Sequence, residues 1–407
     1  MIIRYFSYLE PSGYGLSAIA TVRALLNAGY SVEWLPLQRL GTQVAATPDN
    51  TLGERAATLA ADDASLSDLP AIIQATRVNH AVRGARTAIL QLTPEHFASA
   101  LEQQGSSVTR RIAYTTWETD KIPPHWLPLL RRTDALVVPS RFNARAFAES
   151  GYPGPIHTIG HVRRHRFNEF SSTELSSTRA ALGIRAQDTV FYTVNRFDPR
   201  KALDQLVLAF AAAFSAQDAV VLVIKTSSEG YGPAPWYPVI KPETEITRIL
   251  SEAVSAGSLT AANLPRIRVI AESHASGRSV DVLHAIADCY VSLTHGEGFG
   301  MGACEATTLG TPVIMTAWSG QMDFLGPAWL GGLPYRLDAA PVWPVMQPSY
   351  WSDQRWAVAD QAVTVGRLRD FAANPAPFRD EARALQTRVC NEFSEARIAK
   401  KWAEVLQ

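Results

Sequence analysis

Several features that mark specialised classes of protein are scarce or missing in this chain. Its 407 residues include only three cysteines, Cys289, Cys304 and Cys390, and these form no Cys-x-x-Cys or Cys/His pattern. An odd number of widely spaced cysteines is not a disulfide framework and does not fit a structural zinc site. We therefore expect reduced cysteines in a cytoplasmic protein.

Long apolar segments are also missing. No run of 18 apolar residues occurs, so we expect no helix that spans a membrane. The first ten residues, MIIRYFSYLE, are too short and too polar for a secretory signal peptide. Both observations agree with a cytoplasmic location.

An excess of charge is the third missing feature. Lysine plus arginine and aspartate plus glutamate each total 38, so the formal net charge is zero. Proteins that bind nucleic acid usually carry a broad basic surface, and we expect no such partner here. Arg110-Arg111, Arg131-Arg132 and the run 163–166 are either solvated surface charges or a basic face for anionic lipid headgroups. Peripheral contact with the inner membrane face is therefore an alternative.

The order of apolar segments predicts the fold class. Short apolar strands alternate with amphipathic helices from Ile2 to Thr316, which is typical of parallel α/β sheets covered on both faces. A polar stretch, 168–178, interrupts this alternation and marks a boundary between domains. We predict two Rossmann-like domains, over residues 1–170 and 180–388, facing a cleft.

Three segments carry weaker patterns. Segment 43–67 is rich in Ala, Thr and Asp and is expected to be an exposed loop. The region 333–356 is rich in proline and aromatics and shows no clear period. Residues 355–374 favour a helix.

The segment His295–Thr308 carries the most chemical information. Its sequence, HGEGFGMGACEATT, follows an apolar strand and precedes the helix stop and strand of LGTPVI. A glycine-rich turn before a helix that begins near Phe299 exposes backbone N–H groups, and the helix dipole favours an anion there. Glu297 lies on the turn and Glu305 about two helical turns further on, roughly 10 Å away. Carboxylates at that spacing suit the hydroxyl groups at the two ends of a molecule whose middle is a phosphate.

This Glu-x7-Glu element resembles the donor site of the retaining family 4 glycosyltransferases, which have the GT-B fold. The resemblance implies transfer of a hexosyl group from a nucleotide diphosphate sugar to a hydroxyl acceptor. It also implies that Gly298, Phe299, Gly300 and Met301 bind the donor at its phosphates, and that Glu305 binds the donor beside them. A plain strand-to-helix turn whose glycines serve only packing is the alternative.

A second segment, Thr193–Asp204, resembles the family's Gly-Arg-x(n)-Lys-Gly element. Arg196 and Lys201 stand at the matching places, where the two cations hold the donor diphosphate. Fixed cations stabilise the charge that develops on a leaving diphosphate. The chain departs from the pattern at Asn195 and Ala202, where glycine is commoner.

The turn after the next strand, 316–323, is expected to offer backbone amides to the donor, with Ser319 and Gly320 as the candidates. Trp318 on the same turn suits a core position and a lid equally well. The base would be read by residues 271–274, for which no code applies, so the base stays unassigned.

In the first domain, Gly13 and Gly15 lie in the loop between the first strand and the first helix. The family often has a glycine loop there, close to the phosphates. The run Gly13-x-Gly15-x-x-Ala18, with Glu33 about 20 residues on, also satisfies a dinucleotide fingerprint. An NAD-dependent enzyme is therefore an alternative, although 10–12 lengthen a turn that should be tight.

Another candidate group follows two further strands of the first domain. Glu118 is the candidate for contact with the transferred sugar, in a position where many relatives have a histidine or an acid. Trp117 is the candidate stacking platform for an acceptor ring. His96, at another strand end, is a second acceptor-side candidate, although a lone histidine in a loop is more often structural.

The combined expectation is a metal-independent glycosyltransferase without a bound cofactor. No Asp-x-Asp sequence occurs, so a bridging divalent metal is not expected, and Arg196, Lys201, Glu297 and Glu118 form the predicted catalytic set. By resemblance, the last helix, about 390–407, packs back on the first domain. Acceptors in the family are glycans, lipid-linked carriers or proteins, often in surface polysaccharide or glycoconjugate synthesis. The alternatives are another GT-B enzyme, of phosphorylase or epimerase type, and a non-catalytic nucleotide-sugar or glycan-binding subunit.

Overall fold

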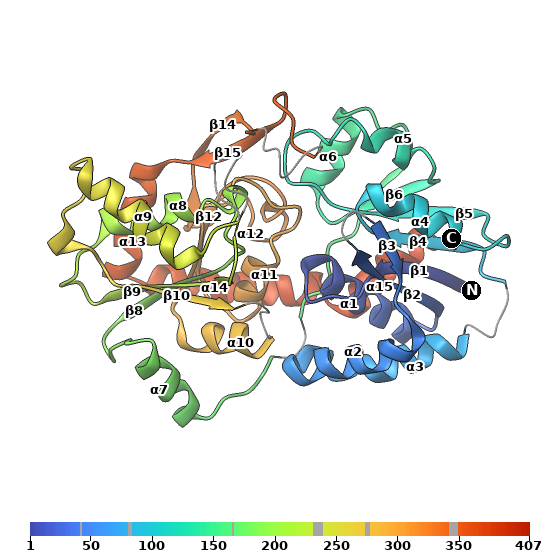
Figure 1. Ribbon diagram of the computed structural model, residues 1–407, viewed down its shortest axis with the longest axis horizontal. Coiled ribbons are helices and arrows are strands. Elements are labelled where there is room, and N and C mark those ends of the chain that lie inside the picture. Colours follow the sequence, from blue (N-terminus) through green and yellow to red (C-terminus); the bar gives the residue numbers. More distant parts are fainter. Residues whose placement is uncertain (41–42, 80–83, 165–166, 231–238, 273–276, 342–348) are drawn as a thin grey trace. The chain divides into compact units, whose positions relative to one another are not determined.

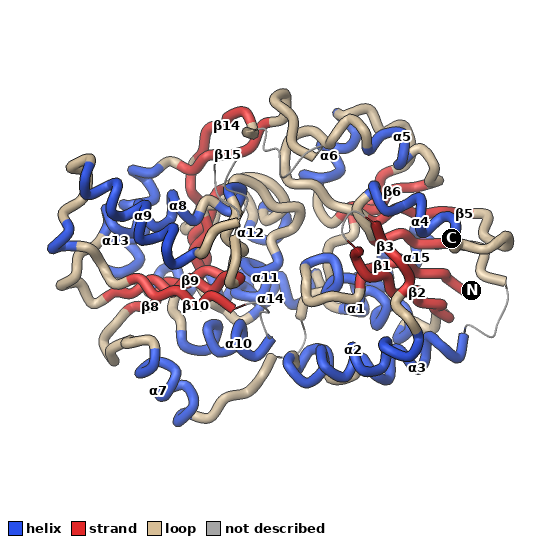
Figure 2. The backbone as a smooth tube through the Cα atoms, in the orientation of Figure 1, coloured by secondary structure: helices blue, strands red, loops and turns tan. Residues whose placement is uncertain are grey.

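The computed structural model describes residues 1–40, 43–79, 84–164, 167–230, 239–272, 277–341 and 349–407. The chain divides into two compact units. The first contains Met1–Phe167 and Cys390–Gln407, and the second contains Asn168–Val389. Each unit is built around its own mainly parallel sheet (Figures 1 and 2).

The first unit has a seven-stranded sheet in the order β3-β2-β1-β4-β5-β6-β7. All neighbouring pairs are parallel except β2 with β3. The central strands are buried because helices cover both faces, which is why their sequences are nearly continuous apolar runs. The strands are β1 Ile2–Tyr8, β2 Ser31–Leu40, β3 Gln43–Ala46, β4 Thr87–Gln91, β5 Arg110–Tyr114, β6 Ala135–Val138 and β7 Ile156–Thr158.

The helices of this unit are α1 Gly13–Asn27, α2 Asp49–Asp62, α3 Leu69–Asn79, α4 Phe97–Glu102, α5 Trp126–Leu130, α6 Arg141–Glu149 and α15 Glu395–Leu406. The C-terminal helix α15 packs beside α1 (Figure 1). Its Trp402 is fully buried and meets Tyr114 edge to face. Two arginines hold the C-terminal segment, since Arg110 donates to the carbonyl of Val405 and Arg163 to that of Cys390.

Several of the arginines predicted to form a basic surface make contacts within the first unit. Arg164 pairs with Asp63 at 2.7 Å, and Arg111 donates to Gln104, so several of the clustered arginines hold the fold together. Arg131 and Arg132 are exposed, and residues 165–166 lie outside the described residues.

The second unit has a six-stranded parallel sheet in the order β10-β9-β8-β11-β12-β13 and a two-stranded antiparallel sheet of β14 and β15. Aromatic packing of Phe191, Phe210 and Phe371 lies at the centre of its core. The strands are β8 Thr189–Val194, β9 Val220–Ser227, β10 Ile267–Glu272, β11 Cys289–Ser292, β12 Val313–Thr316, β13 Gly332–Leu333, β14 Tyr335–Ala339 and β15 Arg355–Ala359.

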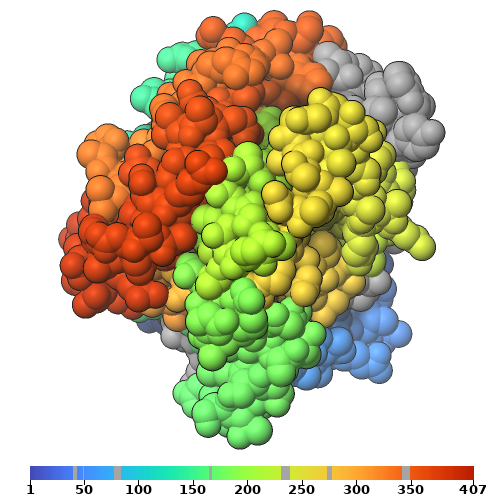
Figure 3. Space-filling model, turned by 90° about the vertical axis from the view of Figure 1, so that its left-hand side faces the viewer, coloured from blue at the N-terminus to red at the C-terminus, as the bar shows by residue number. Residues whose placement is uncertain are grey.

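Helices cover this sheet as well. On the side of the unit seen in Figure 3, the yellow-green α8 runs between the yellow α9 and the red α13. The helices are α7 Ser172–Ala181, α8 Leu203–Ala213, α9 Pro242–Ser255, α10 Gly277–Ile286, α11 Met301–Thr308, α12 Met322–Leu325, α13 Gln361–Ala373 and α14 Ala376–Glu392, with a 3-10 turn, η3, at Pro199–Lys201. Across the described ranges, no helix is both long and apolar enough to span a bilayer.

Two sequence-based expectations about local structure are wrong. Segment 43–67 is not an exposed loop but holds β3 and α2, because alanine is a strong helix former and Leu52 and Ala56 are buried four residues apart. Residues 355–374 are not one helix: β15 comes first and pairs with β14, and α13 begins only after Asp360, which caps it. The pairing of β15 depends on a partner strand distant in sequence, so the residues of 355–359 alone do not indicate a strand.

Candidate functional site

The loop 293–300, between β11 and α11, is held from two sides. The backbone N–H of His295 donates to the carbonyl of Arg200 (2.8 Å), and its carbonyl accepts from the N–H of Ala357 on β15 (3.0 Å). The imidazole Nδ1 lies 2.6 Å from the Ala357 carbonyl, and the ring stacks on Trp356 at 4.3 Å. Burial lowers the pKa of His295, so its ring is neutral and its Nδ1–H donates. The loop therefore presents Glu297 from a fixed backbone.

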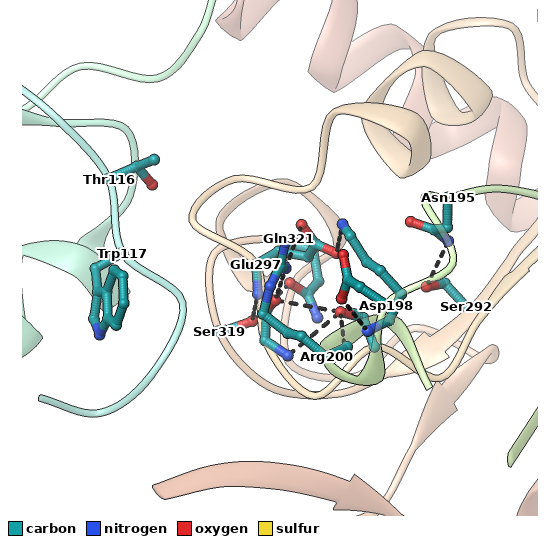
Figure 4. Close-up of polar contacts among 12 residues, drawn as sticks. Thr116, Trp117, Asn195, Asp198, Arg200, Ser292, Glu297, Ser319 and Gln321 are labelled. Atoms are coloured by element: carbon teal, nitrogen blue, oxygen red, sulfur yellow. Dashed lines mark hydrogen bonds and ion pairs between the residues drawn. The ribbon is translucent and has the colours of Figure 1, made fainter. Parts of the chain in front are cut away.

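Glu297 makes ion pairs with two cations, Lys201 and Arg200; Figure 4 labels Glu297 and Arg200. Its Oε1 is 2.6 Å from Nζ of Lys201, and its Oε2 is 3.5 Å from Nη1 of Arg200, which also donates to the carbonyl of Gly296. Burial acts to raise the pKa of Glu297, but the charges of Lys201 and Arg200 outweigh it and hold the pKa below its usual value. The carboxyl group is therefore ionised and can accept hydrogen bonds from a hydroxyl group.

Lys201 is placed by a short turn at the end of β8. The side chain of Asp198 caps the 3-10 turn η3 by accepting from the N–H of Lys201 (3.2 Å). The following residue, Ala202, has a left-handed backbone with φ of 49°. Residues other than glycine adopt this conformation at a cost in free energy. This explains why glycine is commoner there: the chain must turn sharply from the cation into α8.

Ser319 and Gly320 support the backbone of Glu297. The hydroxyl of Ser319 accepts from the N–H of Glu297 (2.9 Å), and the N–H of Gly320 donates to the Glu297 carbonyl (2.9 Å). A Cβ on Gly320 would lie 2.2 Å from the carbonyl oxygen of Gly298, so only glycine allows the two turns to meet. Gln321 completes the support by accepting from Ser319 (2.9 Å). Trp318 is 9% exposed, as expected of a packed aromatic.

Helix α11 begins with an open N-terminus. Gly300 at its N-cap has φ of 91° and offers no side chain to cap the first turn. The adjoining Phe299 is buried and packs on Phe324 at 5.4 Å, while Met301 is half-buried. A Cβ on Gly302 would lie 2.8 Å from the hydroxyl of Tyr290. The first turn of α11 thus has no side-chain cap at the positive end of the helix dipole, the arrangement that binds phosphates.

Glu305, a little over one turn into α11, faces a different residue. Its Oε2 lies 3.5 Å from Nε2 of His284 on α10, and Nδ1 of His284 lies 2.6 Å from the hydroxyl of Tyr192 on β8. No pattern in the sequence pointed to His284.

Arg196 lies on the loop after β8 and is exposed. Neighbouring Asn195 is turned inward, with Nδ2 2.7 Å from Oγ1 of Thr193 and 3.4 Å from Oγ of Ser292 (Figure 4). The cation next to Glu297, besides Lys201, is Arg200. Sequence reasoning missed it because two adjacent basic residues at a strand end are common; the only signal is its place within the 3-10 turn.

The glycine loop of the first unit is a tight turn closed by Ser12. This serine caps α1 by accepting from the N–H of Gly15 (3.2 Å), and a Cβ on Gly15 would lie 2.0 Å from the carbonyl oxygen of Glu10. Gly13, the first residue of α1, is exposed. Glu33, the acid needed by the dinucleotide alternative, is 2% exposed and paired with Arg4 at 2.6 Å. Its carboxylate is thus engaged inside the sheet, which weighs against an NAD site.

His96 lies beside the end of β1. Its Nδ1 is hydrogen-bonded to the hydroxyl of Tyr8 and lies 3.2 Å from Oγ1 of Thr93. Tyr8 and Tyr14 meet edge to face, and Tyr14 is bonded to Thr115 (3.0 Å). The carboxyl ends of β1, β4 and β5 therefore carry a polar, aromatic cluster at the edge where open α/β sheets bind ligands.

Trp117 and Glu118 follow β5. Trp117 is 5% exposed, its indole N–H lies 2.6 Å from both Thr119 Oγ1 and the Lys121 carbonyl, and its ring packs on Trp126 at 4.8 Å. The ring is thus a core residue, and we assign it no stacking with an acceptor. Glu118 is half-buried. Burial is the main cause of the raised pKa of Tyr14; the charges of Tyr8 and Glu118 add to it, and the hydrogen bond with Thr115 acts against it.

Of the residues expected to read the base, 273–274 lie outside the described residues. Among the described residues, no three His, Cys, Asp or Glu side chains gather in a way that could hold a metal ion.

Comparisons with known proteins found a family model that matches part of the second unit. Residues 259–330, which include Glu297, Glu305 and Ser319, match the family model Glycosyl transferases group 1. Over 202 residues the chain is 26% identical to D-inositol 3-phosphate glycosyltransferase from Segniliparus rotundus, a match that covers 49% of this chain and 38% of that protein. The chain thus spans well under two thirds of the length of this curated relative.

Solved structures extend the likeness to the full chain. The fold matches HepE from Anabaena in complex with UDP and glucose, with a TM-score of 0.63 and 15% identity over 100% of this chain and 99% of that one. It matches sucrose-phosphate synthase from Thermosynechococcus elongatus with a TM-score of 0.63 and 17% identity, over 100% and 98% of the two chains. The predicted GT-B fold, two α/β domains with parallel sheets, is therefore confirmed. Within that fold, the match to the family model Glycosyl transferases group 1 is confined to residues 259–330 of the second unit.

Proposed function

We propose that this protein is a retaining glycosyltransferase that moves a hexosyl group from a nucleotide diphosphate sugar to a hydroxyl acceptor. One observation carries the proposal: Glu297 is held by Lys201 and Arg200 on a fixed loop, directly before the open N-terminus of α11. The family match covers this loop and helix, and HepE was solved with UDP and glucose. Uridine diphosphate is therefore the first nucleotide to test.

In the proposed complex the donor diphosphate lies over the first turn of α11. The bare N–H groups of that turn, with Lys201 and Arg196, stabilise its charge. Glu305 accepts hydrogen bonds from ribose hydroxyls, and Glu297 accepts them from the sugar. We propose that these fixed charges act without a bridging metal, since no Asp-x-Asp pair is present to hold one.

The transfer step breaks the bond between the anomeric carbon and the donor phosphate oxygen. The acceptor oxygen attacks the same face of the sugar, and its proton passes to the departing phosphate oxygen, so the anomeric configuration is retained. Negative charge grows on the diphosphate in the transition state, where Lys201 and the α11 N–H groups stabilise it more than in the ground state. Removing one such group typically lowers turnover by about 10²–10³-fold.

The test is release of nucleoside diphosphate from UDP-glucose, UDP-N-acetylglucosamine, GDP-mannose and ADP-glucose, with and without hydroxyl acceptors that include an inositol phosphate. We expect one donor to be used by the wild type, and much less by Lys201→Met. Lys400→Met is the matched control, because Lys400 is an exposed lysine on α15. Equal rates in all three proteins would contradict the site, and the anomeric configuration of the product tests retention.

A further inference from the structure

His284 belongs to a row of three side chains, two of them buried, whose contacts the sequence did not reveal. Tyr192 on β8 is fully buried, His284 on α10 is 6% exposed, and Glu305 on α11 is half-buried. Tyr192 meets His284 through its hydroxyl at 2.6 Å and edge to face at 5.4 Å, and His284 faces Glu305 at 3.5 Å. Tyr290 closes the row from β11 by packing edge to face on Tyr192 at 5.3 Å.

For a neutral imidazole, the positions of Tyr192 and Glu305 favour one of the two tautomers. If Nε2 were bare, its lone pair would face the carboxylate of Glu305, and two acceptors would repel each other. The proton therefore belongs on Nε2, pointing at Glu305, and Nδ1 accepts from the hydroxyl of Tyr192. Burial raises the pKa of Tyr192, so this hydroxyl keeps its proton and remains a donor. The row is a directed chain, from Tyr192 O–H to Nδ1 and from Nε2–H toward Oε2 of Glu305.

We infer that His284 is a positioning residue for the nucleotide site: it holds the carboxylate of Glu305 toward the ribose of the donor. The inference rests on the proposed function, in which Glu305 binds ribose hydroxyls. A glutamate on a helix surface has several rotamers, and a carboxylate that must accept two hydroxyl protons gains from being fixed in one of them. Of the three residues, only Glu305 would touch the ligand.

Two substitutions of His284 separate positioning from structure. In His284→Gln the side-chain amide can place an N–H close to the position of Nε2, so a donor toward Glu305 is kept. In His284→Asn the shorter amide can still meet Tyr192, as Nδ1 does, but it falls short of Glu305. Each protein is titrated with UDP and GDP and with their 2′,3′-dideoxy forms. For each base, the readout is the dissociation constant of the dideoxy form divided by that of the ribonucleotide. Melting temperature is measured alongside.

The expected result concerns that ratio. The wild type should prefer the ribonucleotide by on the order of 10-fold, the range for hydrogen bonds to a charged group. His284→Asn should lose about 3- to 10-fold in ribonucleotide affinity and none in dideoxy affinity, and His284→Gln should stay near the wild type. Combining His284→Asn with Glu305→Gln should add nothing to Glu305→Gln alone.

The other outcomes have separate meanings. If Glu305→Gln lowers the ratio but His284→Asn only lowers the melting temperature, His284 is a packing residue and the inference fails while the proposed function stands. If Glu305→Gln leaves the ratio unchanged, Glu305 does not bind ribose, and the proposed donor site fails along with the inference.

Discussion

The Nζ atom of Lys201 and the Oε1 atom of Glu297 lie 2.6 Å apart, although 96 residues separate them in the chain. Each residue sits just past the end of a neighbouring parallel strand, β8 and β11. Parallel strands bring their carboxyl ends to one edge of the sheet, which is how separate β-α units build a single site. The contact also keeps Glu297 ionised, because against the effect of burial the charges of Lys201 and Arg200 hold the pKa of its carboxyl group below the usual value.

The two cations beside Glu297 should not be equivalent. We predict that Lys201→Met lowers turnover on the order of 10²-fold while donor affinity changes less. Arg200→Met should mainly loosen the loop, because Arg200 donates to the carbonyl of Gly296 and lies 3.5 Å from Glu297. Steady-state kinetics of both variants, with Lys400→Met alongside, would show this difference, and identical kinetic defects would argue against it.

His161 should make stability depend on pH. Burial lowers its pKa from 6.5 to about 3, and its Nδ1 lies 2.8 Å from the hydroxyl of Tyr114. Below pH 6.5 the unfolded chain binds a proton at this residue while the folded protein does not. As the pH falls from 6.5 toward 3, this group alone should therefore lower the free energy of unfolding by about 1.4 kcal/mol per pH unit.

Urea denaturation at pH 7, 6 and 5 checks this contribution. His161→Asn should be less stable than the wild type at pH 7, because a buried ring is lost. The difference between the two proteins should narrow as the pH falls, since the variant lacks the buried imidazole. A constant difference across this range would show that His161 binds protons equally in the folded and unfolded states, and would contradict the lowered pKa.

Gly320 should tolerate no side chain. In Gly320→Ala the new Cβ would lie 2.2 Å from the Gly298 carbonyl oxygen, within the backbone that presents Glu297. We predict a loss of about 1–3 kcal/mol together with loss of donor binding. Gly366→Ala on α13 is the control: its Cβ meets nothing within 4 Å, and alanine should stabilise the helix by up to about 1 kcal/mol. Thermal denaturation of both variants tests the contrast.

Ala202 should show two opposing effects. Replacement by glycine removes the strain of the left-handed backbone, about 1–2 kcal/mol, and also a buried methyl group worth about 0.8 kcal/mol. We predict that Ala202→Gly lies within about 1 kcal/mol of the wild type. Ala202→Val should be strongly destabilised, because β-branched residues adopt this backbone least readily. A valine variant as stable as the glycine variant would contradict the strained turn.

Much of the fold could be predicted from the sequence because its determinants are local. The alternation of apolar strands with helices and the glycine-rich turn 295–302 each depend on neighbouring residues, and the GT-B fold expected from them is confirmed. Segment 43–67 was mistaken for a loop because its composition is ambiguous. The pairing of β14 with β15 was missed because it depends on residues about 20 positions apart in sequence.

The sequence predicted which residues belong to much of the candidate site, but not the contacts among them. Lys201, Glu297 and Ser319 followed from motifs, whereas Arg200 has no pattern that separates it from a surface charge. In the sequence His284 looks like an ordinary helical residue; only the fold brings it to 3.5 Å from Glu305. Trp117 shows the converse: an aromatic after a strand resembles a binding platform, but its indole is bonded inside the domain.

The most direct measurement is a thermal-shift screen of the wild type against UDP, GDP, ADP, TDP, their sugars and NAD, with and without EDTA. A ligand that binds only the folded protein raises its melting temperature, by about 2.7 kcal/mol of added stability at 100 times the dissociation constant. We predict a clear shift with one nucleoside diphosphate and its sugar, unchanged by EDTA and lost in Lys201→Met. A shift with NAD alone, or none with any nucleotide, would contradict a nucleotide-sugar site at Glu297.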